Sequence, residues 1–228
     1  MRQFKLALFT ALCAFGATGM FAQGMKYAPL SEYMMPEDAE AALAKSAAPQ
    51  NISDHATIRV LTPSGYKIVR QGDNGFVCMV MRGFTGAPTF GPADERIYVN
   101  YDAKTRAPVC FNPQAVKTAL PYFDLRTKLG LEGKNPDQIT AAVKSAYDQG
   151  KIPKRAGGFA YMWSADQVLG PAGHWHPHMR VFVPGYENSM FGNYERGSPF
   201  PVVDHDSGTP FAMLAIPVDD KLFVKPQP

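Results

Sequence analysis

The chain has 228 residues, of which 46% are hydrophobic and 19% are charged, and its formal net charge at pH 7 is +3. The 20 glycines and 20 prolines favour many turns and short elements over a long helical bundle. No block of lysine or arginine follows the N-terminal segment that could track a phosphate backbone, so nucleic acid and anionic membrane surfaces are poor candidates as partners. A small ligand of unknown kind remains a possible partner of the protein.

The first 22 residues are predicted to be a cleavable export signal. Arg2 and Lys5 precede the apolar stretch 6–17, and small residues follow as far as Ala22. The stretch is shorter than the roughly 20 apolar residues of a membrane-spanning helix. A lipid-modified Cys13 is an alternative, but the residue before it is a bulky leucine.

Removal of residues 1–22 would change both the charge and the location of the protein. Two of the 23 basic residues leave, so 21 remain against 20 acidic ones and the net charge falls to +1. We expect the mature protein to be periplasmic or extracellular and to have no membrane span. Residues 23–50 are predicted to form a leader and a surface helix, and residues 51–228 a single domain of ordinary size.

Two cysteines remain after export, Cys78 and Cys110. In an oxidising compartment they can form a disulfide, closing a loop of about 30 residues that contributes about 3 kcal/mol to stability. Two separate buried thiols are an alternative. A zinc site that uses both is less favoured, because neither has a cysteine close by in the sequence.

The first half of the domain is predicted to begin with a helix and three strands. Residues 36–48 are rich in Ala and Glu and end at Pro49, so they predict a helix with an alanine face. Strands are predicted at 56–61, 66–70 and 76–81. Gly72-Asp73-Asn74-Gly75 is a hairpin signal, which makes the three strands a meander. The third strand is apolar on both faces and is predicted to be central.

The second half is predicted to alternate helices and strands. Asn112 and Asn135 are N-cap residues that each precede a proline, and Gln138 completes a capping box for the second helix, which Gly150 ends. Pro121 is expected to interrupt the first helix. The predicted strands are 96–101, 159–163, 179–183, 211–216 and 222–224, with irregular loops over 83–92 and 184–210. The whole pattern predicts an α+β domain with a mostly antiparallel sheet and two or three helices.

Three of the five histidines lie within five residues, as His174, His176 and His178. In an extended chain alternate side chains face the same way, so the three imidazoles could bind zinc or another divalent transition metal. Asp204 and His205 lie about 26 residues later and could complete the site. Asp204 and Asp206 would face together, with His205 opposite, unless the chain bends there.

Other residues argue against a metal. Arg180 shares a face with His178, and a fixed cation about 7 Å away disfavours a divalent ion. Pro177 lacks an amide donor and suits an edge strand or a loop. The spacing of Gly170, His176 and His178 resembles the first cupin motif, but the glutamate expected four or five residues later is replaced by Phe182 and Val183.

Two alternatives follow for this segment. His178 and Arg180 could bind a carboxylate or a phosphate group without a metal. Otherwise Trp175, Met179, Val181 and Val183 are core, and the histidines lie on an exposed strand face or at the rim of a loop. The sequence therefore supports two functional hypotheses: a metal-binding exported protein, whether hydrolase or oxidoreductase, or a non-catalytic envelope or secreted binding module with one disulfide.

The stretch from Gly72 to Cys78 resembles a motif in a group of uncharacterised exported bacterial proteins. Those proteins have a Gly-Thr-Asn-Gly-Trp-Thr-Cys-like hairpin after a signal peptide and an alanine-rich helix, and a second cysteine 20 to 30 residues later. Their later segments are similar to residues 177–179 and 209–212 here, with one histidine at the place of His178. Asp73 and Phe76 depart from the pattern, and His174 and His176 are additions. The resemblance implies an architecture and no activity.

Overall fold

A single eight-stranded sheet, mostly antiparallel, forms the centre of an α+β fold, as the sequence predicted. The computed structural model describes residues 25–155, 157–169, 173 and 176–218. The strand order is β2-β1-β3-β4-β5-β6-β8-β7. The strands are β1 (Thr57–Thr62), β2 (Gly65–Arg70), β3 (Val77–Met81), β4 (Ala107–Phe111), β5 (Phe159–Met162), β6 (His178–Phe182), β7 (Val202–His205) and β8 (Met213–Pro217).

The helices outnumber the two or three that were expected. They are α1 (Leu30–Tyr33), α2 (Glu37–Lys45), α3 (Gln50–Ser53), α4 (Gly83–Gly86), α5 (Ala93–Tyr101), α6 (Pro113–Thr118), α7 (Leu120–Leu131) and α8 (Pro136–Asp148), with a 3-10 helix η4 (Asn188–Phe191). Both predicted caps are present: Asn112 accepts from the amide of Ala115, and Asn135 forms a capping box with Gln138. Pro121 lies in the first turn of α7, where a missing amide is tolerated, so α6 ends and α7 begins there.

Two predictions in the middle of the chain were wrong. Residues 96–101 were predicted as a strand, yet they belong to α5, because tertiary packing overrides the β propensity of a short run. The neighbouring strand β4 was not predicted at all. It is buried along its whole length and contains Pro108, so it shows neither the alternation nor the composition by which strands are recognised.

The predicted meander was also wrong. Strand β2 pairs with β1, but β3 does not pair with β2; it lies on the other side of β1 and runs parallel to it. The Gly72–Gly75 segment is therefore a crossover and not a hairpin. A Cβ at Gly72 would lie 2.3 Å from the carbonyl carbon of Ala56, so a glycine is required where this segment passes the start of β1.

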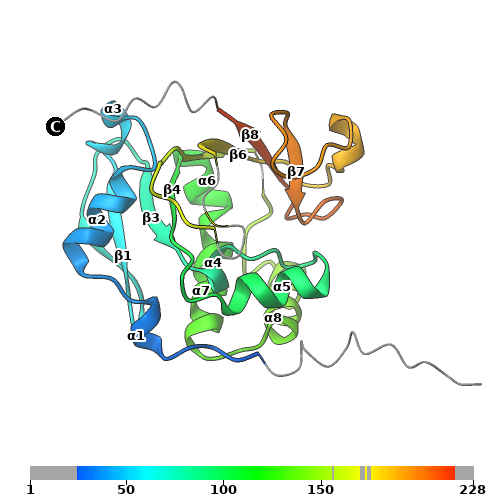
Figure 1. Cartoon of the computed structure of the whole chain (residues 1–228), viewed down its shortest axis with the longest axis horizontal. Coiled ribbons are helices and arrows are strands. Elements are labelled where there is room, and N and C mark those ends of the chain that lie inside the picture. The colour runs from blue at the N-terminus through cyan, green and yellow to red at the C-terminus, as the bar shows by residue number, and fades with distance from the viewer. Residues whose placement is uncertain (1–24, 156, 170–172, 174–175, 219–228) are drawn as a thin grey trace, which may run out of the picture.

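Helices cover both faces of the sheet (Figure 1). Helix α2 packs on one face, where Ala44, Ala47 and the Cys78–Cys110 disulfide are buried together. Helices α6, α7 and α8 cover the other face over the main core, which includes Phe111, Phe123 and Ile139. The outer side of α2 is exposed, whereas Glu40 on its inner side is fully buried.

The predicted Cys78–Cys110 disulfide is present, with the two cysteines directly opposite each other on β3 and β4.

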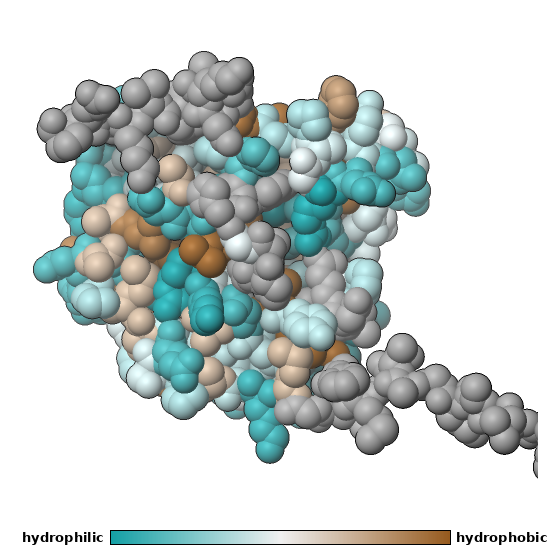
Figure 2. Space-filling view, viewed as in Figure 1, coloured by the Kyte–Doolittle hydropathy of each residue, from teal (hydrophilic) through white to brown (hydrophobic). Residues whose placement is uncertain are grey.

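In the part of the chain that the structure describes, no helix is both long and apolar enough to cross a membrane. On the face shown in Figure 2 the hydrophobic side chains gather in small groups among hydrophilic ones.

The C-terminal part departs from the prediction in one place. Strands β5 and β6 are antiparallel, as predicted. The segment 184–210 was expected to be irregular, but it contains η4 and the edge strand β7. The predicted strand at 222–224 lies outside the described residues.

Candidate functional site

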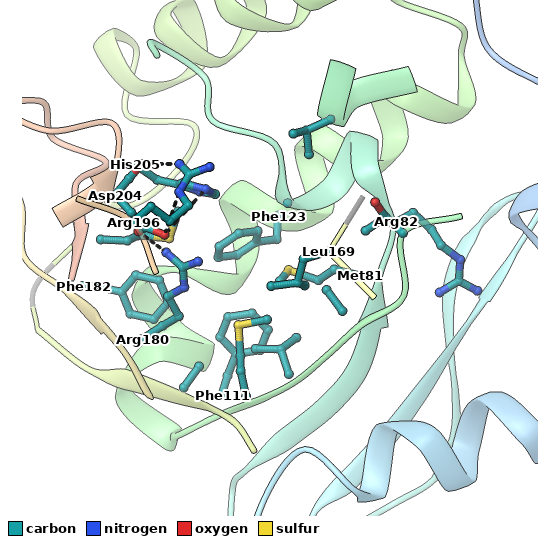
Figure 3. A pocket seen from close by; sticks show the side chains of 18 of the residues that line it. Met81, Arg82, Phe111, Phe123, Leu169, Arg180, Phe182, Arg196, Asp204 and His205 are labelled. Carbon is teal, nitrogen blue, oxygen red and sulfur yellow. Dashed lines mark hydrogen bonds and ion pairs between the residues drawn. The ribbon is translucent and has the colours of Figure 1, made fainter. Parts of the chain in front are cut away.

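A cavity of about 290 Å³ lies between the sheet and the helices that cover its main core (Figure 3). Most of its wall is apolar. The sheet contributes Met81, Val109, Phe111, Met162, Phe182 and Met213. Phe123 of α7 and Val99 of α5 face them, and Leu169 from the loop after β5 adds to the wall.

The register of the sheet explains why these residues meet. Ala107, Val109 and Phe111 are alternate residues of β4, so they share one face. Met81 on β3 pairs with Ala107, and Ala160 on β5 pairs with Phe111, which continues the same face across three strands. Alanines among aromatic residues leave the space that the cavity occupies.

One end of the cavity is polar and contains Arg180, Arg196, Asp204 and His205. Arg180 comes from β6, and Arg196 from the loop between η4 and β7. Asp204 and His205 are consecutive residues of β7, and an ideal strand would point them to opposite faces. A register shift between Val203 and His205 supplies the bend that allows both side chains to line the cavity.

Arg180 is held from two sides. One Nη donates to Oδ1 of Asp204, whose side chain is 1% exposed. Its Nε donates to Nε2 of His178 at 3.2 Å. His178 therefore carries its proton on Nδ1, which donates to the carbonyl oxygen of His176 at 2.9 Å. His178 is fully buried and positions Arg180 without lining the cavity.

Burial sets the protonation of these groups. Burial, together with the charge of Arg180, lowers the pKa of His178 to about 3. Burial likewise lowers the pKa of His205 to about 3, although Asp204 opposes the shift. Burial alone would raise the pKa of Asp204, but Arg180, His205 and Arg196 outweigh it and the pKa is lowered. At neutral pH the two histidines are neutral and the aspartate is charged.

Two buried polar atoms at this end have no hydrogen-bond partner within the described part of the chain, namely Oδ2 of Asp204 and Nδ1 of His205. The Oδ2 atom lies 3.7 Å from Nε of Arg196 and 3.9 Å from Nε2 of His205. Buried polar atoms are usually paired, so such atoms beside a cavity indicate a place for a further polar group.

Asp206 does not join the polar end. It has a φ of +53°, and its carboxylate turns away to accept from the amides of Thr89 and Phe90. Burial raises the pKa of Asp206. Its role is structural, because these bonds fasten the end of β7 to the segment before α5.

Arg82 also borders the cavity, but its guanidinium group points away from it (Figure 3). The group donates to the carbonyl oxygens of Tyr33 and Val80 and to the carboxylate of Glu40. All of these bonds lie on the α2 side of the sheet. The charge of Arg82 is therefore already compensated by Glu40.

The predicted three-histidine metal site stays a prediction. His174 lies outside the described residues, His176 is exposed and His178 is buried. No group of three or more His, Cys, Asp or Glu side chains within the described ranges is placed to hold a metal ion. Ligation by His178 would also require it to give up its bond to Arg180 or to the carbonyl oxygen of His176.

The alternative that placed one face of β6 in the core holds only in part. Met179 and Val181 are half-buried, although Val181 and Val183 pack against a small hydrophobic cluster, and Trp175 lies outside the described residues. The opposite face is the more buried one, because His178, Arg180 and Phe182 are all buried. Polar residues can occupy the buried face because Asp204, 24 residues away, compensates the charge of Arg180.

The sequence pointed to Arg180, Asp204 and His205 but missed Arg196 and the apolar wall. Arg196 lies in a segment without a regular pattern, and nothing local marks it. The sequence gives no signal for the wall that β4 forms, because this strand is buried on both faces and its residues show no alternation of apolar and polar types.

Comparison with known proteins adds no further information on this site. A scan against protein-family models and searches of curated proteins and solved structures each returned no match.

Proposed function

We propose that this protein is an exported binding module that holds a small apolar molecule in the cavity between the sheet and α7. The observation that carries the proposal is the cavity itself, with an apolar wall and a few convergent polar groups at one end. That combination is typical of small-molecule sites, whose volumes begin at about 300 Å³.

Export is part of the proposal and is supported by two features. The N-terminal sequence has the charge and the apolar stretch of a secretory signal. The disulfide joins neighbouring strands of the domain, and disulfides persist in oxidising compartments outside the cytosol.

The methionines of the cavity wall provide a direct test. In protein labelled at the methionine methyl groups, titration with 1-octanol should shift the NMR signals of Met81, Met162 and Met213, which line the cavity. Met190 is 63% exposed on η4 and should not move. Unchanged signals for all three lining methionines at saturating 1-octanol would contradict the proposal.

A variant that fills the cavity provides a second test of where 1-octanol binds. Ala107→Leu should place about three extra carbon atoms in the cavity and weaken 1-octanol binding at least tenfold, without loss of thermal stability. Ala160→Met fills the same space from β5 in case the first variant folds poorly. Ala42→Leu, exposed on α2 beyond the opposite face of the sheet, should leave the affinity unchanged.

A further inference from the structure

The two unpartnered atoms at the polar end of the cavity show what kind of group the ligand must carry. The carboxylate of Asp204 has two oxygens with different contacts. Its Oδ1 accepts from Arg180, whereas Oδ2 lies 3.7 Å from Nε of Arg196 and 3.9 Å from Nε2 of His205, beyond hydrogen-bonding distance. An ionised carboxylate only accepts hydrogen bonds. Oδ2 therefore requires a donor, an O–H or an N–H.

His205 offers a second, adaptable partner at its Nδ1 atom, which is buried and unpartnered. Its imidazole is neutral at pH 7, because burial lowers its pKa to about 3. A neutral imidazole carries one proton, which can sit on either ring nitrogen. No hydrogen bond from Nε2 to Asp204 fixes the tautomer, since the two atoms are 3.9 Å apart. Nδ1 can therefore donate to a ligand or accept from it.

A hydroxyl group suits these two atoms better than other common ligand groups. It has one donor and two lone pairs, so a single oxygen can donate to Oδ2 of Asp204 and accept from Nδ1 of His205. An ether or an ionised carboxylate has no donor for Oδ2. An ammonium group has three donors, and Oδ2 and Nδ1 are the only unpartnered side-chain atoms in the described wall of the cavity. At least one N–H would then lack such an acceptor.

The rest of the cavity limits the body of the ligand. A volume of about 290 Å³ holds about ten non-hydrogen atoms, if each takes the roughly 30 Å³ of a water molecule in the liquid. The wall around this space is mostly apolar, with Phe111, Phe123 and Phe182 close to the polar end (Figure 3). A body with further polar groups would leave them unpaired there.

We propose that the ligand is a neutral hydroxyl compound with a small apolar body. Its hydroxyl group pairs with Oδ2 of Asp204 and Nδ1 of His205, and its body lies among Phe111, Phe123 and Phe182. This inference rests on the proposed function and specifies the ligand class of the same cavity.

Isomeric ligands test whether the donor matters. 1-Octanol and heptyl methyl ether contain the same atoms and have nearly the same length, but only the alcohol can donate. In calorimetric titrations at pH 7, 1-octanol should bind at least about tenfold more tightly, as expected for a hydrogen bond to a charged group. The isomers 2-phenylethanol and benzyl methyl ether make the same comparison with an aromatic body. A preference for the alcohol in either pair supports the inference.

Variants of the two residues test the assigned contacts. His205→Leu and His205→Asn have side chains of similar size, but only asparagine keeps a polar group. His205→Leu should lower the affinity for 1-octanol about fivefold and leave that for the ether within about twofold, and His205→Asn should lose less. Asp204→Asn presents an N–H in place of Oδ2, so the alcohol and the ether should bind alike. His55→Leu, at an exposed histidine beside Asp73, should change neither affinity.

Thermal unfolding of each variant shows whether it is folded, and the His205 pair decides if Asp204→Asn does not fold. Ethers that bind as tightly as their isomeric alcohols to the wild type would overturn the hydroxyl ligand and leave the cavity as a binding site. The same holds if His205→Leu keeps the full preference for 1-octanol. If neither the alcohols nor the ethers bind, the proposed function itself fails.

Discussion

At the scale of single residues, the buried face of β6 shows how a charge is accommodated inside the protein. Arg180 is tolerated because Asp204 and His178 satisfy it from two directions. His178 is in turn restricted to one tautomer by the carbonyl oxygen of His176. The histidine that the sequence marked as a metal ligand thus has a hydrogen-bonding role in the structure.

This network predicts a pH dependence of stability. The pKa of His178 is about 3 in the folded protein and about 6.5 when unfolded, so below pH 6.5 the unfolded state binds a proton that the folded state excludes. Stability should fall as the pH drops from about 6.5 towards 3, by about 2 kcal/mol between pH 7 and 5 for this residue.

Replacement of the imidazole tests this assignment. Glutamine can still accept from Arg180 and donate to the carbonyl of His176, but it does not titrate. His178→Gln should therefore remove about 2 kcal/mol of the acid sensitivity, measured by denaturant unfolding at pH 7 and 5. His55→Gln, at an exposed position, is the matched control. The same pH slope in His178→Gln and the wild type would show that His178 does not titrate as described.

At the scale of elements, helix α2 is fastened to the sheet by a buried carboxylate. Glu40 accepts from the amide of Leu61 at 3.0 Å and from Arg82 at 2.6 Å, and both charged side chains are fully buried. The alanine face of α2 allows this close approach. The sequence predicted the helix and its alanine face, but not the contact, because the partners lie 21 and 42 residues away.

Loss of the negative charge of Glu40 should lower the free energy of unfolding. Glu40→Gln leaves Arg82 buried without its counter-ion and should lower the free energy of unfolding by about 3–5 kcal/mol. Glu37→Gln removes the exposed partner of Lys67 on the same helix and should cost less than about 1 kcal/mol. Chemical denaturation of both variants provides the comparison. Similar small losses would mean that the buried pair does not hold α2 in place.

At the scale of the whole molecule, the disulfide joins β3 and β4, two neighbouring interior strands of the sheet, beneath α2. Its cysteines are 32 residues apart in the sequence. Closing a loop of that length restricts the unfolded chain and contributes about 3–4 kcal/mol. The bond therefore stabilises the sheet that forms the floor of the cavity.

Removal of the bond tests that contribution. The double variant Cys78→Ala with Cys110→Ala should lose about 3–4 kcal/mol of unfolding free energy relative to the oxidised wild type. Wild-type protein unfolded in the presence of a reductant should show a similar loss, which separates the effect of the bond from that of the sulfur atoms. A loss in the variant that the reduced wild type does not share would point to packing.

Local signals in the sequence were sufficient for the capped helices, the β1–β2 hairpin, the cysteine pair and the α+β class. Each depends on residues close together or on composition: Asn135 and Gln138 are one helical turn apart, and alternation is visible within a single strand.

Only the tertiary structure decided the strand order, the crossover at Gly72 and the cavity. The polar end brings together β6, β7 and a loop, and it depends on a bulge that turns both Asp204 and His205 inward. Whether a charged side chain is buried or exposed depends on a partner that lies far away in the chain. For Arg180 that partner is Asp204, and no pattern within β6 specifies it.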